Sequence, residues 1–393
     1  MTASKRFNAS QPASWRGGVC PRGSPTSSAI DRTPFRDPAL PNLFTQGAPV
    51  AVIAMGLAFV LLLGEIDLSA GFGSGVCAAV MAKLMAEHGQ PWWLSLLAGL
   101  GTGAVIGLII GLSVAKVGIP SFVITLAAFL ALQGVVLLII GNGGNISIRD
   151  KTIVAIDNNN LSPMLGWLLF ALCVGGYGAA QLARRATRVR KKLVTEPVPV
   201  TVLRVAAVAV IGGLAVFFLN MERSRNSAII SLRGIPVVVV IVLILLAIWT
   251  YVLSGTAFGR HIYAVGGNAE AARRAGISVA RVRIAGFVIC STMAGIGGVI
   301  AASRATSVDP NAGGSNTLLY AVGAAVIGGT SLFGGKGRAF DALLGGAVVA
   351  VVDNGMGLMG YSAGVKFVVT GAILAVAAGV DALSRKRAAA TGL

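Results

Sequence analysis

The sequence predicts an all-α polytopic membrane protein with about ten to eleven transmembrane helices, some of them broken or re-entrant. Hydrophobic residues make up 55% of the 393 positions and charged residues only 12%, whereas soluble domains carry about a quarter charged residues. Apolar stretches of roughly 20 residues, the length that spans a bilayer as a helix, recur along most of the chain. The chain also contains 53 glycines, which suit the close packing of membrane helices.

Changes of composition divide the chain into three parts. Residues 1–43 are polar and rich in Ser, Pro and Arg, without the apolar core of a secretory signal, and we expect them to be disordered. Residues 44–383 form the predicted transmembrane domain, and residues 384–393 form a predicted cytoplasmic tail. The apolar segments expected to be helices are 46–63, 68–86, 92–115, 119–140, 161–183, 200–219, 235–254, 283–302, 317–333, 339–357 and 364–382. The segment 317–333 is short and glycine-rich, which predicts a broken or re-entrant helix.

Basic residues predict how the chain is oriented in the membrane. Much of the net charge of +18 lies in short runs between apolar segments, at 184–192, 260–283, 336–338 and 385–387. Counting spans back from the C-terminus places these four runs on one side, which the positive-inside rule assigns to the cytoplasm. The basic loop 221–234 falls on the other side, and the same count places the basic N-terminus outside. The pattern is typical of a multi-pass membrane protein and does not indicate a nucleic-acid partner.

Residues that catalyse reactions or bind metals are too scattered to form a site. The four cysteines show no metal-ligand spacing and only two histidines occur, so neither a metal site nor a catalytic group is expected. The stretch 326–337 resembles a phosphate-binding loop, but Thr330 occupies the place of its first glycine, and Gly337 follows Lys336 where Ser or Thr belongs. We therefore expect no enzymatic activity and no bound cofactor in this chain, so that any ATP must be handled by a partner.

The stretch 64–71 interrupts the first apolar region with two carboxylates, Glu65 and Asp67, followed by Ser69. Carboxylates at membrane depth are costly and usually face a cavity or another protein group. The flanking glycines favour a helix broken within the membrane, where freed backbone groups can border a translocation path. Glu65, Asp67 and Ser69 are therefore candidate path residues. The alternative is an ordinary loop between two short spans.

A second polar group lies near the end of the apolar region. Asp353 and Asn354 lie inside one apolar span, and Lys366 lies early in the next. If they pair with each other or line a polar path, they are candidates for the same translocation path. Lys366 can equally extend its long side chain to the membrane interface, and the sequence does not separate the two interpretations.

One predicted span carries a glycine every four residues, at Gly99, Gly103, Gly107 and Gly111. This spacing leaves one helix face as bare backbone, which lets a neighbouring helix approach closely. The pattern therefore predicts close helix packing and does not indicate a catalytic or binding site.

The stretch 259–276 predicts a short, fully capped helix in a basic cytoplasmic loop. An asparagine suits its N-cap, a glutamate its first turn, two arginines its last turn and a glycine its C′ position. Ala271, Ala272 and Ala275 give it a shallow face that can enter the groove of a partner, whereas a solvated surface turn would not need both caps. The candidate docking residues are Gly267, Asn268, Glu270, Ala271, Ala272, Arg273, Arg274 and Gly276.

Together these motifs resemble the permease subunits of bacterial sugar ABC importers of the ribose/xylose type. The matching features are 64–71, 259–276, Asp309-Pro310, 328–337 and Asp353-Asn354-Gly355, within a resemblance that covers about residues 41–381. Glu270-Ala271-Ala272 followed by Gly276 also resembles the loop through which importer permeases engage their ATPase. The arginine-rich loop 184–192 and the added span 200–219 look closest to the xylose and multiple-sugar branch.

The sequence departs from this family in two places. Members usually begin with an apolar helix ahead of the segment that matches Pro41-Asn42-Leu43, where this chain has polar residues. An acidic residue that often follows the Asp-Pro motif is replaced by Asn316-Thr317-Leu318, which puts substrate specificity in question.

The resemblance implies a permease that forms the translocation path for a monosaccharide, with xylose or a related sugar expected. It implies four partners: an ATP-binding cassette subunit, an extracytoplasmic sugar-binding protein, a second permease copy and the surrounding membrane lipid. Two alternatives stay open. The first is a permease of the same fold for another small solute, such as a nucleoside, a furanose signal or a branched amino acid. The second is an ion-coupled secondary transporter.

Overall fold

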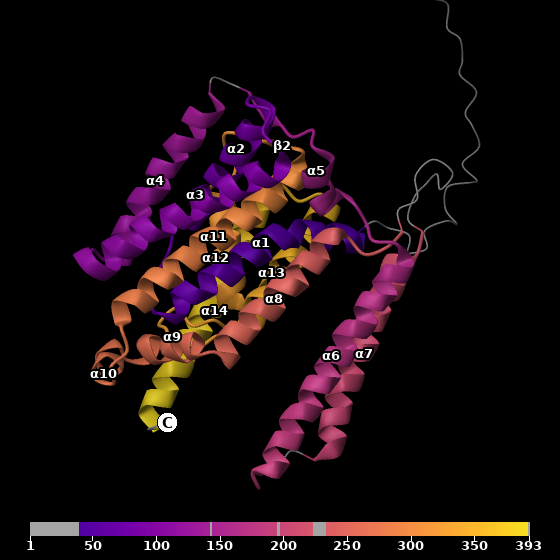
Figure 1. The fold of residues 1–393 in the computed structure, drawn as a ribbon, viewed down its shortest axis with the longest axis vertical. Helices are drawn as coiled ribbons and strands as arrows, with labels where there is room; N and C mark the ends of the chain where they lie inside the picture. Colours follow the sequence, from indigo (N-terminus) through magenta and orange to yellow (C-terminus); the bar gives the residue numbers. More distant parts are fainter. Residues whose placement is uncertain (1–38, 142–143, 195–196, 223–232, 392–393) are drawn as a thin grey trace, which may run out of the picture. The chain divides into compact units, whose positions relative to one another are not determined.

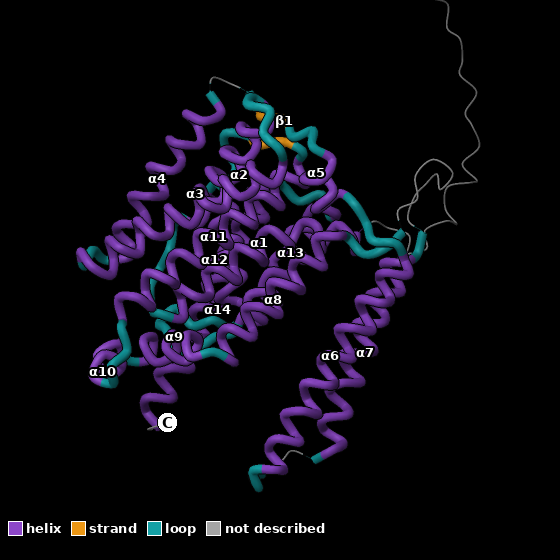
Figure 2. Tube along the Cα trace, viewed as in Figure 1, coloured by secondary structure: helices purple, strands orange, loops and turns teal. Residues whose placement is uncertain are grey.

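The computed structural model describes residues 39–391, except for 142–143, 195–196 and 223–232. The described part is almost entirely helical, and all eleven predicted apolar segments hold a helix (Figures 1 and 2). The elements are α1 (Ala39–Leu62), α2 (Ala70–Ala86), α3 (Trp92–Leu112) with a π-helical end (Ser113–Val117), α4 (Ser121–Ile140), β1 (Ile146–Ser147), α5 (Lys151–Asn158), α6 (Pro163–Arg190), α7 (Val198–Asn220), α8 (Val237–Gly255), α9 (Ala257–Gly267), α10 (Ala269–Arg274), α11 (Val279–Ala305), β2 (Ser307–Val308), α12 (Ser315–Ile327), α13 (Ala339–Leu358) and α14 (Ala363–Thr391).

Nine of the described helices are long and apolar enough to cross a membrane. α2, with 17 residues, and α12, with 13, are apolar but shorter. The predicted fold class, an all-α polytopic membrane protein with some interrupted helices, is therefore confirmed. The predicted boundaries differ in two places. α1 already begins at Ala39, inside the segment expected to be polar and disordered, whose residues 1–38 lie outside the described chain. α14 continues to Thr391 through the predicted tail.

α1 is the most enclosed of the membrane-spanning helices. Figure 1 shows it within the bundle, and it packs against α8, α11, α12 and α13. Small residues permit these contacts: a Cβ added to Gly56 would lie 2.7 Å from Met293 Cβ, and one added to Gly47 would lie 3.0 Å from Ala350 Cβ. Most of the α1 surface therefore contacts protein instead of lipid.

The glycine face predicted on α3 is confirmed. A Cβ at Gly99 would lie 2.7 Å from the carbonyl oxygen of Cys77 on α2, and one at Gly107 would lie 2.4 Å from that of Phe287 on α11. The bare face of α3 thus lets the backbones of two neighbouring helices approach closely.

Two non-helical links interrupt the bundle. The first joins α1 to α2 and begins at Gly64, whose φ of +74° is the left-handed conformation that suits glycine. The second leads from β2 into α12 and packs against the start of α2, since a Cβ at Gly71 would lie 2.8 Å from Gly313 O. The helix predicted within 317–333 ends at Ile327, because Gly329 adopts a φ of +115° and a glycine-rich loop follows.

Three small elements that were not predicted cover one end of the bundle. β1 and β2 pair antiparallel, Ile146 opposite Val308, and α5 lies beside them (Figure 2). α5 is attached to the end of α11, because Asn158 Nδ2 donates to Ser303 O at 2.7 Å and the Asp157 N–H donates to Ser303 Oγ at 3.1 Å.

α6 and α7 form an antiparallel hairpin and lie side by side (Figure 1). Leu169 and Phe170 on α6 pack with Val216 and Leu219 on α7. Most of the remaining apolar surface of both helices is exposed.

Candidate functional site

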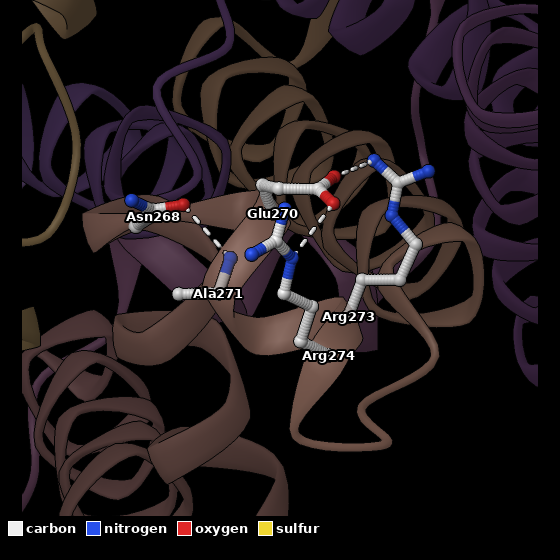
Figure 3. Close-up of polar contacts among 5 residues, drawn as sticks. All are labelled: Asn268, Glu270, Ala271, Arg273 and Arg274. Carbon is white, nitrogen blue, oxygen red and sulfur yellow. Dashed lines mark hydrogen bonds and ion pairs between the residues drawn. The ribbon is translucent and has the colours of Figure 1, made fainter.

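α10 is a short capped helix directly after α9. Asn268 ends α9 and caps α10, since its Oδ1 accepts a hydrogen bond from the Ala271 N–H at 2.9 Å (Figure 3). Glu270 in the first turn is ion-paired with Arg273 and, at 3.3 Å, with Arg274. All three charged side chains are more than half exposed, so the pairs add little stability. Together, Glu270, Arg273 and Arg274 place one negative and two positive charges on a solvent-exposed surface.

The C-terminal end of α10 is closed by a glycine, as the sequence predicts. Gly276 has a φ of +83°; its N–H donates to Arg273 O at 3.0 Å, and the Ile277 N–H donates to Ala272 O at 3.0 Å. These two hydrogen bonds form the Schellman motif, which satisfies carbonyl groups that the helix itself leaves free. Both predicted caps are therefore confirmed.

Ala272 corrects the predicted alanine face. Its side chain is buried, in a hydrophobic cluster to which α1, α9 and α11 contribute Leu62, Val265 and Val282. Ala271 and Ala275 are exposed. Ala272 therefore anchors α10 to its own subunit, because one side of any helix in a surface loop must pack on the body below it. Of the three alanines of the predicted face, only Ala271 and Ala275 are exposed.

α9 joins α10 to the rest of the bundle through contacts made largely by backbone atoms. Gly335 N–H donates to Leu62 O at 2.9 Å, and Tyr263 Oη donates to Gly337 O at 2.7 Å. A Cβ added to Gly266 would lie 1.7 Å from Leu62 O. We call these five residues the α9 junction. It fixes α9, the end of α1 and the glycine-rich loop 328–338 to one another.

Glu65 lies in the link between α1 and α2 and forms an ion pair with α11. Its Oε1 is 3.1 Å from Arg283 Nε, and the Glu65 side chain is only 12% exposed. Arg283 stands in the second turn of α11, the helix that follows α10. The predicted path residue Glu65 therefore lies at the same end of the bundle as the candidate docking helix.

Asp67 and Ser69 lie at the start of α2 and are fully enclosed. Asp67 Oδ1 accepts hydrogen bonds from the backbone N–H of Ser69 at 2.9 Å and from its hydroxyl at 2.5 Å. The second carboxylate oxygen, Oδ2, is buried without a hydrogen-bond partner. The link is also held by α4, because Ser121 Oγ accepts from Ile66 N–H at 3.3 Å and Thr125 Oγ1 donates to Ile66 O at 3.2 Å. In this conformation neither Asp67 nor Ser69 borders an open path.

The other predicted polar group is Asp353, Asn354 and Lys366, and it lies near the C-terminal end of α13, away from the end of α13 that packs near Leu62. Lys366 Nζ is 3.4 Å from Asp353 Oδ1, so the two residues pair, as one of the two interpretations proposed. Asn354 beside them is partly buried. Ala339, the first residue of α13, belongs to the same buried cluster as Leu62 and Ala272. Asp353 lies about 14 residues further along α13, so roughly 20 Å separates it from Ala339. The structure therefore separates the six predicted path residues into two distant groups.

The glycine-rich loop 328–338 folds back on its own chain. Ser331 N–H donates to Lys336 O at 2.9 Å, Phe333 N–H to Ser331 Oγ at 3.3 Å, and Gly335 N–H to Leu62 O. The Ser331 hydroxyl also donates to Asp381 Oδ2 at 2.9 Å. A phosphate-binding loop needs free N–H groups directed at the ligand, and these three are already used.

Sequence reasoning missed a buried carboxylate in α5. Asp157 is 4% exposed, and neither of its carboxylate oxygens has a hydrogen-bond partner. Burial raises the pKa of Asp157 to about 7, although the positive charge of Arg304 opposes the shift. No sequence signal marked this residue, because α5 is short and its packing on α11 depends on residues far apart in the chain.

The apolar helices, the interrupted spans and the polar groups enclosed between them define a polytopic membrane protein. A family model described as the permease component of the branched-chain amino acid transport system matches residues 39–378, and the chain belongs to this family.

Three curated relatives are similar over nearly the whole chain. The xylose transport system permease protein of Escherichia coli is 36% identical, covering 88% of this chain and 85% of the relative. The D-allose transport system permease protein of Escherichia coli is 28% identical, covering 88% and 83%. The ribose import permease protein of Escherichia coli is 28% identical, covering 86% and 84%. No solved structure matches the chain.

These relatives confirm the resemblance seen in the motifs. The chain is a permease of the ribose/xylose type of sugar ABC importer and a multi-pass protein of the inner membrane. Its relatives are transport subunits, and it is one as well, not an enzyme. The family implies an ATPase subunit and a binding protein as partners.

Proposed function

We propose that the chain forms the translocation path for xylose or a closely related monosaccharide, as one of two permease copies in an ATP-driven importer. The observation that carries the choice of sugar is the identity of 36% with the xylose permease, against 28% with the allose and ribose permeases over nearly the same residues. The second copy and the surrounding membrane lipid follow from the importer class and belong to the same proposal.

The experiment is a substrate panel. The permease is reconstituted in liposomes with the importer ATPase and the binding protein of its own genome, and uptake of labelled xylose, ribose, allose and leucine is measured with and without ATP. ATP-dependent uptake of xylose above the other three is expected. Leucine is included because the family description names branched-chain amino acids. Preferred uptake of ribose, allose or leucine would contradict the choice of sugar, and uptake without ATPase would contradict the importer.

We further propose that α10 is the surface on which the ATPase docks. A capped helix anchored by Ala272 can transmit a displacement to α9, and the α9 junction then passes it to α1 and the loop 328–338. Ala271, Ala275 and the charged group of Glu270, Arg273 and Arg274 form the exposed contact surface.

Two substitutions in α10 test the docking surface. Glu270→Lys removes both ion pairs and places a positive charge at the helix start, and Gly276→Val puts a branched side chain at a φ of +83°. Each local effect is about 1 kcal/mol, too little to unfold the bundle. We expect normal amounts of permease in the membrane but reduced co-purification of the ATPase and reduced substrate-stimulated ATP hydrolysis.

The matched control is Glu87→Lys. Glu87 is also an exposed glutamate in an i, i+4 ion pair, with Lys83, but it follows α2 at the opposite end of the bundle. Its reversal should leave ATPase binding unchanged. Normal ATPase binding and coupling in both α10 variants would mean that the ATPase docks elsewhere.

We also propose that this chain binds no ATP or other cofactor. The loop 328–338 is the segment closest to a phosphate-binding motif, and the N–H groups of Ser331, Phe333 and Gly335 are bonded within the protein. Purified permease alone should show no saturable ATP binding or hydrolysis, and Lys336→Ala should change nothing in that assay. ATP hydrolysis that disappears in Lys336→Ala would refute the proposal.

A further inference from the structure

α6 is longer than a bilayer requires. Its 28 residues extend about 42 Å at 1.5 Å per residue, whereas the hydrocarbon core is about 30 Å thick. The first 20 residues, 163–182, carry no charge, and the last two turns carry Arg184, Arg185, Arg188 and Arg190. The excess length therefore coincides with the arginines and places them at the level of the lipid headgroups.

Arginines from both helices of the hairpin line one hollow at this end. The hollow has a volume of about 750 Å³, and the described residues that line it include Gln181, Arg184, Arg185, Arg188, Thr201 and Arg204 of the hairpin and Ser254 of α8. None of these described lining residues is acidic. Arg184 and Arg188 are four residues apart, hence on one face of α6, and both are exposed. Guanidinium groups match phosphate oxygens with paired hydrogen bonds, so the hollow suits a phosphate-containing anion.

The rest of the hairpin indicates where such an anion comes from. Large apolar side chains of α6 and α7, among them Leu168, Leu172, Leu203 and Ile211, are at least half exposed in the chain. In a bilayer this surface contacts acyl chains, so lipid molecules lie next to the hairpin that carries the arginines. Membrane orientation alone requires basic residues near the cytoplasmic end, but it does not require arginines from two helices to line one hollow.

We propose that the hollow lined by the ends of α6, α7 and α8 binds the phosphate group of an anionic phospholipid of the cytoplasmic leaflet. The guanidinium groups of Arg184 and Arg188 bind the phosphate oxygens, and the exposed apolar surface of the hairpin binds the acyl chains of the same lipid. The hairpin thereby holds a bound lipid at the edge of the permease.

The test uses the full-length permease in nanodiscs of mixed phosphatidylcholine and phosphatidylglycerol. After release from the nanodisc, native mass spectrometry measures which lipids stay bound. In Arg184→Gln/Arg188→Gln, we expect the apparent affinity for phosphatidylglycerol to fall roughly thirtyfold, about fivefold for each arginine removed. Arg184→Lys/Arg188→Lys keeps the charge but loses the planar geometry that forms paired hydrogen bonds with phosphate, so it should bind phosphatidylglycerol less tightly than the unmodified protein but more tightly than the Gln double variant. Arg185, Arg190, Lys191 and Lys192 remain and preserve the positive-inside signal.

The control is Arg149→Gln/Lys151→Gln, which removes two exposed cations at the opposite end of the bundle. It should bind phosphatidylglycerol as the unmodified protein does, and excess inorganic phosphate should not displace the lipid. The proposal is overturned if the α6 double variant retains the lipid at the normal level, or if the control loses it equally. Displacement by inorganic phosphate would instead assign the hollow to a soluble anion and overturn the lipid assignment.

Discussion

Gly266→Ala is expected to destabilise the permease strongly and to disconnect α9 from α1. The added Cβ would lie 1.7 Å from Leu62 O and 2.9 Å from Gly335 N. Backbone atoms cannot rotate away as a side chain can, so α9 or the end of α1 must shift. Overpacking usually costs about 1–3 kcal/mol, and we expect the upper end of this range even though alanine favours a helix more than glycine does. Thermal unfolding of the purified protein in detergent measures the effect.

The neighbouring residue provides the control. Gly267 also lies in α9, and a Cβ there would have no atom within 4 Å. Gly267→Ala gains the same helix propensity without the clash, so its unfolding temperature should stay equal or rise. Equal unfolding temperatures for the two variants would mean that the α9 junction adapts, and that it does not tie α9 rigidly to α1.

Loss of the ion pair between Glu65 and Arg283 is expected to reduce transport more than any other single charge change in the described bundle. The pair joins the α1–α2 link to α11 at the end where α10 lies, and Glu65 is nearly enclosed. Removing one partner of such a pair should cost more than the roughly 1 kcal/mol of an exposed pair and less than the about 3–5 kcal/mol of a fully buried one. Glu65→Gln and Arg283→Gln should each lower ATP-driven uptake at equal permease levels.

Exchanging the two charges distinguishes an effect of the ion pair from separate effects of Glu65 and Arg283. If the ion pair itself matters, Glu65→Arg/Arg283→Glu should recover part of the uptake that each single variant loses. Asp353→Asn serves as the comparison, because its pair with Lys366 is more exposed and lies at the other end of α13.

Asp67→Asn tests the second carboxylate of the link between α1 and α2. Full uptake in both Glu65→Gln and Asp67→Asn would show that these residues only complete a loop.

The sequence was sufficient wherever the signal is local. Eleven apolar segments, the glycine face of α3 and both caps of α10 follow from spacing and residue type, because a helix and its caps are set by neighbours within a few residues. Contacts between distant residues could not be predicted. Glu65 was recognised as a charge at membrane depth, but its partner Arg283 looked like one more residue of a basic loop. The same limit explains Ala272, whose burial depends on where α1, α9 and α11 meet.

The enclosure of α1 has a consequence for biosynthesis. α1 leaves the ribosome before any of the other described spans, yet it packs against Met293 of α11 and Ala350 of α13, which are synthesised last or nearly so. Until those helices arrive, the small-residue faces of α1 must be covered by lipid, by the translocation machinery or by temporary neighbours. Assembly of the bundle is therefore a long-range step that follows insertion, of the kind that folds slowly and is sensitive to interruption. A chain that stops before α11 would insert its early helices but leave α1 without its main partners.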